Sequence, residues 1–221
     1  MSAPAPLEAV LFDFGGVFTE SPFGAAEALG IELGAPAGQL LELVFGPYHA
    51  DTDHPWHRLE RGEMSFADAR EAILALGREV GVDCDPLRVF QKMGSAGGVR
   101  EAMIERARSL RASGLRTALV TNNAREFRER WRSLLPAEEL FEHVIDSSEV
   151  GVRKPDPAIF RIALARLGDP APSCTLFVDD YEGNVAAARE LGLQTLLVAA
   201  DPGPTLAALD AILAQRSARP R

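Results

Sequence analysis

Cysteine and basic residues are both scarce in this sequence. Only two cysteines occur among 221 residues, Cys84 and Cys174, which argues against a fold held together by disulfides. Lys and Arg number 23 against 32 Asp and Glu, so the formal net charge is -9. Because nucleic-acid surfaces need clustered basic side chains, this balance argues against nucleic acid as a partner.

Long apolar runs and several familiar motifs are also missing. No run approaches the length that crosses a bilayer, and residues 1–10 lack the basic and apolar regions of a secretory signal. We therefore expect no membrane partner and a cytoplasmic location, whereas the sequence predicts no particular oligomeric state. The absence of a phosphate-binding P-loop, of GxGxxG and of GxSxG disfavours nucleotide-dependent kinases, dinucleotide oxidoreductases and hydrolases with a serine elbow.

Short apolar runs that stop at polar residues recur along the chain. The first run, residues 9–12, ends at Asp13 and is followed by Gly15 and Gly16. Comparable runs alternate with segments of helical period, and this alternation predicts an α/β fold with a doubly wound, Rossmann-like parallel sheet. The later runs cover 117–120, 141–145, 175–178 and 195–199, and the helical segments cover 99–113, 157–167, 184–191 and 204–214.

The interval 20–98 breaks this alternation, because it holds helical segments and turns but no comparable strand. We interpret it as a small α-helical cap domain inserted into a core made of residues 1–19 and 99–221. The glycine-rich stretch 94–98 is predicted to be the return hinge. Motion of such a cap would control access to a site at the cleft.

Polar side chains gather at the predicted carboxyl ends of the strands, where open parallel sheets bind ligands. Asp13, Thr121 and the pair Asp179 and Asp180 occupy these positions. Three carboxylates at one sheet edge repel one another unless a cation neutralises them, and hard oxygen ligands suit Mg²⁺. Lys154, just before a predicted helix, could supply a fixed positive charge to the same edge.

Four short motifs lie in order at these strand ends. They read FDFGGV at 12–17, VTN at 120–122, KPD at 154–156, and VDD at 178–180 with Asn184 four residues further on. In this order they resemble the haloacid dehalogenase superfamily, specifically the members that carry a helical cap after the first strand. The resemblance spans nearly the whole chain.

The resemblance implies a phosphatase that acts on a small phosphorylated metabolite. Asp13 would attack phosphorus and form a phosphoaspartate that water hydrolyses. In addition, Thr121 and Asn122 would bind phosphate, Lys154 would neutralise charge, and Mg²⁺ would be held by Asp13, Asp179 and the carbonyl of Gly15. Asp180 and Asn184 would orient these ligands.

One position departs from the family's pattern. Phosphatases of the family usually carry a second Asp two residues after the nucleophile, and here that position is Gly15. A general acid/base contributes about 10²–10⁴-fold to a rate, so a sugar-1-phosphate or another phosphate with a good leaving group is favoured over an alkyl ester. The sequence also resembles sugar-1-phosphate phosphatases and the phosphatase domain of soluble epoxide hydrolases. The alternatives are a 2-haloacid dehalogenase and a catalytically impaired binding or regulatory protein.

A histidine-rich segment of the predicted cap offers weak candidates for the missing acid. His49, His54 and His57 are equal candidates, since imidazole titrates near neutrality. Pro55 prevents a regular helical His pair, so a zinc site is disfavoured. Solvent-facing histidines, with water as the acid, are the simpler interpretation.

Overall fold

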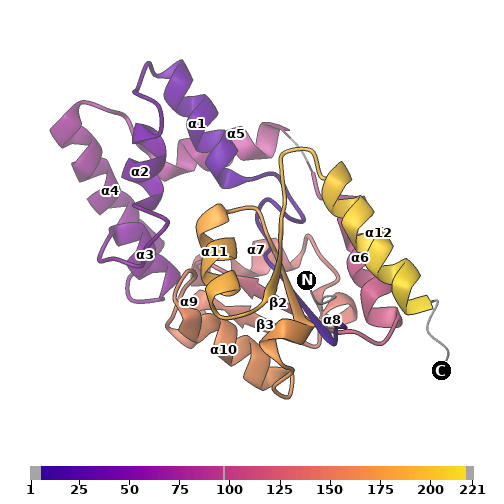
Figure 1. The fold of residues 1–221 in the computed structure, drawn as a ribbon. Helices are drawn as coiled ribbons and strands as arrows, with labels where there is room; N and C mark the ends of the chain where they lie inside the picture. The colour runs from indigo at the N-terminus through magenta and orange to yellow at the C-terminus, as the bar shows by residue number, and fades with distance from the viewer. Residues whose placement is uncertain (1–5, 97, 218–221) are drawn as a thin grey trace.

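A five-stranded parallel sheet organises the computed structural model, which describes residues 6–96 and 98–217. The strand order is β3-β2-β1-β4-β5, so the first strand of the chain is the central one (Figure 1). The five strands are β1 (Ala9–Phe12), β2 (Arg116–Thr121), β3 (His143–Asp146), β4 (Thr175–Asp179) and β5 (Gln194–Leu197).

Helices cover both faces of the sheet. Successive residues of a strand point to opposite faces, so each face packs its own set of side chains against the helices that cover it. Val10 and Phe12 pack in a core cluster with residues of α6 and α12, whereas Ala9 and Leu11 pack with residues of α10 and α11. The doubly wound α/β fold is therefore confirmed. The helices outside the 20–96 interval are α6 (Glu101–Ala112), α7 (Arg128–Arg132), α8 (Ala137–Leu140), α9 (Ser147–Val150), α10 (Pro157–Arg166), α11 (Glu182–Glu190) and α12 (Gly203–Ser217), with 3-10 turns η1 (Arg125–Phe127) and η2 (Pro172–Cys174).

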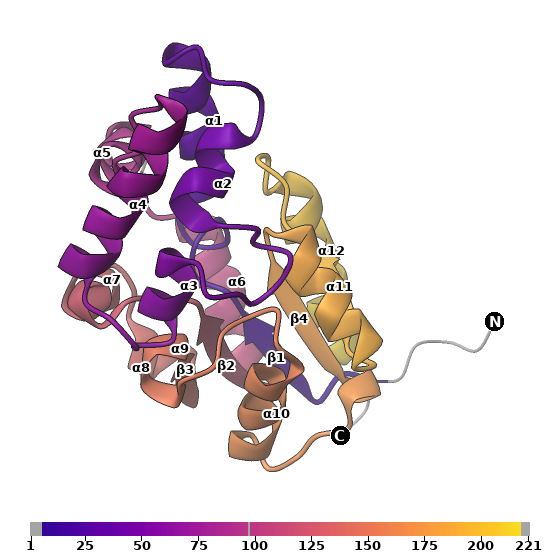
Figure 2. The same ribbon diagram turned by 90° about the vertical axis from the view of Figure 1, so that its left-hand side faces the viewer.

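The segment between β1 and α6 folds as a group of five helices with its own apolar core. Figures 1 and 2 show the group beside the sheet, beyond the carboxyl end of β1, and we call it the helical unit. Trp56, Leu59 and Ile73 are buried in its core. No strand lies between residues 20 and 93, as predicted, and none of the described helices of the chain is long and apolar enough to span a membrane. The helices of the unit are α1 (Pro22–Glu32), α2 (Gln39–Phe45), α3 (Pro55–Glu60), α4 (Phe66–Val80) and α5 (Pro86–Ala96).

The predicted return hinge differs from the structure. Residues 94–96 continue α5 rather than forming a loop, while residue 97 lies outside the described residues. Extending a helix that is already formed costs little free energy. The helix α5 therefore continues into the glycine-rich stretch, where the composition predicted a loop. Of the described residues between α5 and α6, 98–100 are irregular.

Candidate active site

The strand register brings the predicted acidic residues together. Phe12 of β1 pairs with Val178 of β4, and the Asp13 amide donates to the Val178 carbonyl at 2.9 Å. The chain therefore leaves both strands at the same level, with Asp13 beside Asp179. Carboxylate oxygens of Asp13, Asp179 and Asp180 all lie within 4.8 Å of one another.

Lys154 lies between two of these carboxylates. Its Nζ is 2.6 Å from Asp13 Oδ1 and 2.7 Å from Asp179 Oδ2. The lysine is 1% exposed, so it cannot exchange these partners for water without a change of structure. Burial opposes its charged form, but the charges of Asp13 and Asp179 outweigh that effect and raise the pKa of Lys154.

The buried carboxylates of Asp13 and Asp179, with the half-buried Asp180, exceed the charge that one lysine can balance. Burial raises the pKa of Asp13 to about 7, although Lys154 opposes the rise and Asp179 adds to it. Burial, with the charges of Asp179 and Asp13, likewise raises the pKa of Asp180 to about 8. This cluster is thus a region where a further positive charge would be favourable.

The other two carboxylates of the cluster are held by their neighbours. Asn184 Nδ2 donates to both carboxylate oxygens of Asp179 at 3.1 Å, and the Tyr181 amide donates to Oδ1 at 2.8 Å. The carboxylate of Asp180 lies against the backbone of Gly16, where φ is +70°. Asn184 therefore contacts Asp179. Asp180 is itself one of the three clustered carboxylates, not a residue that only contacts them.

Thr121 and Asn122 end β2 at the same edge. Thr121 is buried, and its hydroxyl is 3.5 Å from the Asn122 carbonyl oxygen. The Asn122 side chain holds the backbone of Lys154: its Oδ1 accepts from the Lys154 amide at 2.8 Å, and its Nδ2 donates to the Lys154 carbonyl at 3.0 Å. Phosphate binding by Thr121 and Asn122 stays a prediction, and the structure adds this positioning contact.

Three residues near Lys154 escaped the sequence analysis, namely Tyr48, Glu60 and Arg153. Glu60 and Arg153 form a buried ion pair of 2.7 Å, and Tyr48 bonds to Glu60 at 2.8 Å. One sequence signal was present: Glu60 follows Trp56 by four residues, which places its carboxylate on the same face of α3 as that apolar ring. A buried acid on a helix face implies a buried basic partner.

Two of the three candidate histidines, His54 and His57, do not suit the role of acid. His57 is fully buried in the helical unit, and burial lowers its pKa to about 3, while burial lowers that of His54 to about 4. Both imidazoles are therefore neutral near pH 7. Both rings also lie against the backbone of Gly46. The side chain of His49 is exposed, and its backbone lies beside Gly183 at the start of α11.

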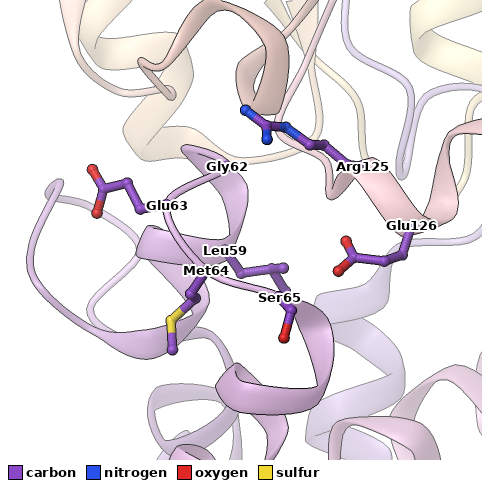
Figure 3. A pocket seen from close by; sticks show the side chains of 7 residues that line it. All are labelled: Leu59, Gly62, Glu63, Met64, Ser65, Arg125 and Glu126. Carbon is purple, nitrogen blue, oxygen red and sulfur yellow. The ribbon is translucent and has the colours of Figure 1, made fainter.

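A cavity of about 240 Å³ lies between the helical unit and the rest of the chain (Figure 3). The loop after α3 lines one side, including Glu63 and Ser65, and Arg125 and Glu126 line the other. None of its lining residues belongs to the carboxylate cluster. The cavity marks the boundary along which the helical unit meets η1.

Comparison with known proteins gives a family match over most of the chain. Residues 7–192 match the family described as haloacid dehalogenase-like hydrolase. Acyl-CoA dehydrogenase family member 10 of Mus musculus is 30% identical over 86% of this chain and 18% of that protein. Bifunctional epoxide hydrolase 2 of the same species is 27% identical over 71% of this chain and 30% of that protein. The chain thus spans less than a third of either relative.

A relative of similar length and two solved structures complete the comparison. A sesquiterpene phosphatase of Aspergillus oryzae is 25% identical over 84% of this chain and 87% of that protein. A HAD family enzyme of Bacteroides thetaiotaomicron, in complex with magnesium and inorganic phosphate, superposes with a TM-score of 0.59 at 22% identity over 88% of this chain and 96% of that one. L-2-haloacid dehalogenase of Xanthobacter autotrophicus gives 0.58 at 20% identity over 91% and 81%. These two similarities establish the fold.

Proposed function

Because this chain belongs to the haloacid dehalogenase-like hydrolase family, we propose that it is a Mg²⁺-dependent phosphatase of small phosphate monoesters. One observation carries the proposal: Lys154 joins Asp13 to Asp179, and Asp180 completes a cluster of three carboxylates. A dehalogenase needs a nucleophilic carboxylate but no metal. The two additional carboxylates therefore favour phosphoryl transfer.

The chemistry of the cluster fits Mg²⁺. With all groups ionised, three carboxylates and one lysine give the cluster a net charge of two negative units, and a divalent cation would balance it. Asp13, Asp179 and the carbonyl of Gly15 would hold the ion, and the position of Asp180 makes it a further candidate ligand. When bound, the ion would neutralise charge on the phosphoryl group.

The protein residues have separate roles in this reaction. Asp13 attacks phosphorus as the ester P–O bond breaks, and the leaving oxygen takes up a proton. Water then attacks the phosphoaspartate at phosphorus, which releases inorganic phosphate and restores the Asp13 carboxylate. Lys154 stabilises charge on the transferring group, and Thr121 donates a hydrogen bond to one of its oxygens.

The substrate class follows from Gly15. No carboxyl group stands two residues after Asp13 to protonate the leaving group, and His54 and His57 are buried and neutral. The proton then comes from solvent, from the substrate itself or from the exposed His49. This favours a sugar phosphate, or another ester whose leaving group needs little protonation.

Access to the site is restricted. Asp13 is 8% exposed and Lys154 is 1% exposed, so only a small part of the nucleophile is open to a substrate in this arrangement. We assign the opening to the helical unit, acting as a cap of residues 20–98 on a core of residues 1–19 and 99–221. Closure over a bound substrate would then exclude bulk water from the phosphoaspartate.

A substrate panel tests the proposed function. Sugar phosphates and a chromogenic aryl phosphate are incubated with and without Mg²⁺, using the natural protein and Asp13→Asn. We expect phosphate release that requires both the metal and Asp13. Halide release from 2-haloacids without metal would identify a dehalogenase, and no turnover of any compound would favour a binding protein.

A further inference from the structure

We propose that Glu60 and Tyr48 are positioning residues for Lys154, acting through Arg153 and Asn122. Docking of the helical unit would then set the lysine in place, so closure and assembly of the site become one event. The proposal rests on the proposed function only for the role of Lys154. The contacts themselves are independent of the reaction.

Glu60 is the central group of this network. Its Oε2 accepts from Arg153 Nε at 2.7 Å, and its Oε1 accepts from the Tyr48 hydroxyl and from Trp56 Nε1, both at 2.8 Å. The Glu60 side chain is 3% exposed and that of Arg153 is 0% exposed. Such a desolvated ion pair depends strongly on both partners, because either charge alone would be left buried and uncompensated.

The Arg153 side chain is held by the helical unit. Besides Glu60, it donates from Nη1 to the Ala50 carbonyl at 3.2 Å, and its guanidinium carbon lies 4.5 Å from the Tyr48 ring centre. Asp51 lies 3.7 Å from Nη1. All of these contacts come from residues 48–60. Withdrawal of the helical unit would thus remove every one of them and hydrate the arginine.

The backbone of Lys154 is held from a second direction. The Asn122 side chain bonds both the amide and the carbonyl of Lys154, and its Nδ2 also donates to the Tyr48 hydroxyl at 3.1 Å. Tyr48 therefore bonds to both Glu60 and Asn122. The peptide of Lys154 is fixed on one side by Arg153 and on the other by Asn122, while its Nζ reaches Asp13 and Asp179.

Positioning of this kind matters because the lysine acts by its location. Displacing a catalytic group by about 1 Å can lower the reaction rate on the order of a hundredfold. Glu60→Gln keeps the shape of the side chain but removes its charge, and Tyr48→Phe keeps the ring but removes the hydroxyl. The second variant remains informative if the first fails to fold.

Backbone amide exchange of Lys154 tests the proposal without any turnover. We expect the Lys154 amide to exchange at least about tenfold faster in Glu60→Gln and in Tyr48→Phe than in the natural protein. The matched control is Glu126→Ala, which removes another contact with the helical unit, the 2.8 Å bond from the Phe66 amide, beside the cavity of Figure 3. This control should leave the Lys154 amide unchanged. Unchanged exchange in both test variants would overturn the proposal, even if the protein proves not to be a phosphatase.

A double-mutant cycle adds a kinetic readout. On an aryl phosphate, Tyr48→Phe should lower kcat by about tenfold with little change in KM, while Glu126→Ala stays within about twofold. In a Lys154→Ala background, Tyr48→Phe should cost less than about twofold, because the group that it positions is gone. Equal losses in both backgrounds would mean that Tyr48 has only a general structural role.

Discussion

At the scale of single residues, the two glycines after Asp13 meet very different surroundings. A Cβ on Gly15 would find Pro22 Cδ at 3.6 Å, an ordinary contact. A Cβ on Gly16 would lie 1.9 Å from Asp180 Oδ2, at a φ of +70° that disfavours any side chain. The structure therefore requires glycine at position 16 and merely accommodates it at position 15.

These surroundings predict opposite outcomes for two matched substitutions. Gly16→Ala should displace Asp180, lower turnover of an aryl phosphate by more than about tenfold and reduce the free energy of unfolding by about 1–3 kcal/mol. Gly15→Ala should retain turnover within about threefold, because its backbone and carbonyl are unchanged. Turnover assays and urea unfolding measure both effects. Similar behaviour of the two variants would contradict the placement of Asp180 against Gly16.

A second prediction at this scale concerns His57. Its pKa is about 3 in the folded protein, whereas an imidazole in an unfolded chain titrates near pH 6.5. The unfolded state therefore takes up the proton first on acidification. The stability that neutral His57 provides is complete above about pH 6.5 and declines by about 1.4 kcal/mol per pH unit below it.

The substitution His57→Gln should remove this dependence. Between pH 7.5 and pH 5.0, the free energy of unfolding of the natural protein should fall by about 2 kcal/mol more than that of the variant. Urea unfolding at the two pH values measures the difference. The comparison isolates His57, because every other titrating group is common to both proteins. Parallel pH profiles would show that His57 is equally protonated in both states.

The sequence predicted the acidic residues of the site but not the residues that hold the lysine. Asp13, Asp179 and Lys154 stand next to predicted strand ends or helix starts, and the topology of a parallel sheet alone brings them to one edge. Glu60 and Arg153 meet only through packing of the helical unit on the sheet. No local pattern specifies that contact, although a glutamate on an apolar helix face pointed to a buried partner.

At the scale of elements, the KPD motif has two parts with different functions. Lys154 extends into the carboxylate cluster, whereas Asp156 is the N-cap of α10 and accepts from the Ala158 amide at 2.8 Å. Pro157 occupies the first helical position, where its missing N–H costs nothing. The motif therefore combines a candidate catalytic group with the start of the helix that follows it.

The capping role of Asp156 predicts a stability effect that depends on the replacement. Asp156→Ala should lower the free energy of unfolding by about 1 kcal/mol, because one amide at the start of α10 loses its acceptor. Asp156→Asn is the matched control, since asparagine caps helices about equally well, and it should remain within a few tenths of a kcal/mol. Urea unfolding distinguishes them. Equal losses would indicate that the charge of Asp156, rather than its capping bond, stabilises the protein.

Element boundaries show where sequence reasoning was strong and where it failed. The runs at 117–120 and 175–178 became β2 and β4 within one residue at each end, because buried parallel strands are continuous apolar runs. The run at 141–145 became β3 from His143 only, since Phe141 packs in the core after α8. Composition alone cannot distinguish an apolar residue that enters a strand from one that precedes it.

At the scale of the whole molecule, the chain has apolar cores on both faces of the sheet and a further core inside the helical unit. Charged and polar contacts, including the pair Glu60 and Arg153, join that unit to the rest, as do apolar contacts from Ala124, Phe127 and Tyr181 to its core. The carboxylate cluster lies where strands from distant parts of the sequence end. Binding of a cation there should consequently stabilise the folded chain as a whole.

Mg²⁺ should raise the free energy of unfolding, by about 2.7 kcal/mol at a concentration one hundred times its Kd. Burial raises the pKa values of Asp13 and Asp180 to about 7 and about 8, so protons compete with the cation as the pH falls through this range. The stabilisation should therefore be larger at pH 8.5 than at pH 6.0. Thermal unfolding with Mg²⁺ or EDTA measures it, and Asp179→Asn should abolish most of the difference. A Tm insensitive to Mg²⁺ at pH 8.5 would argue against the metal site.

The central place of β1 also has a consequence for protein synthesis. This strand leaves the ribosome before both strands that pair with it, β2 and β4. At about 5–20 residues per second, roughly ten to thirty seconds separate the appearance of Asp13 from that of Asp179. During that interval the nascent chain carries a carboxylate without the lysine and acids that would make it reactive. We therefore expect hydrolytic activity only after Asp179 has been made.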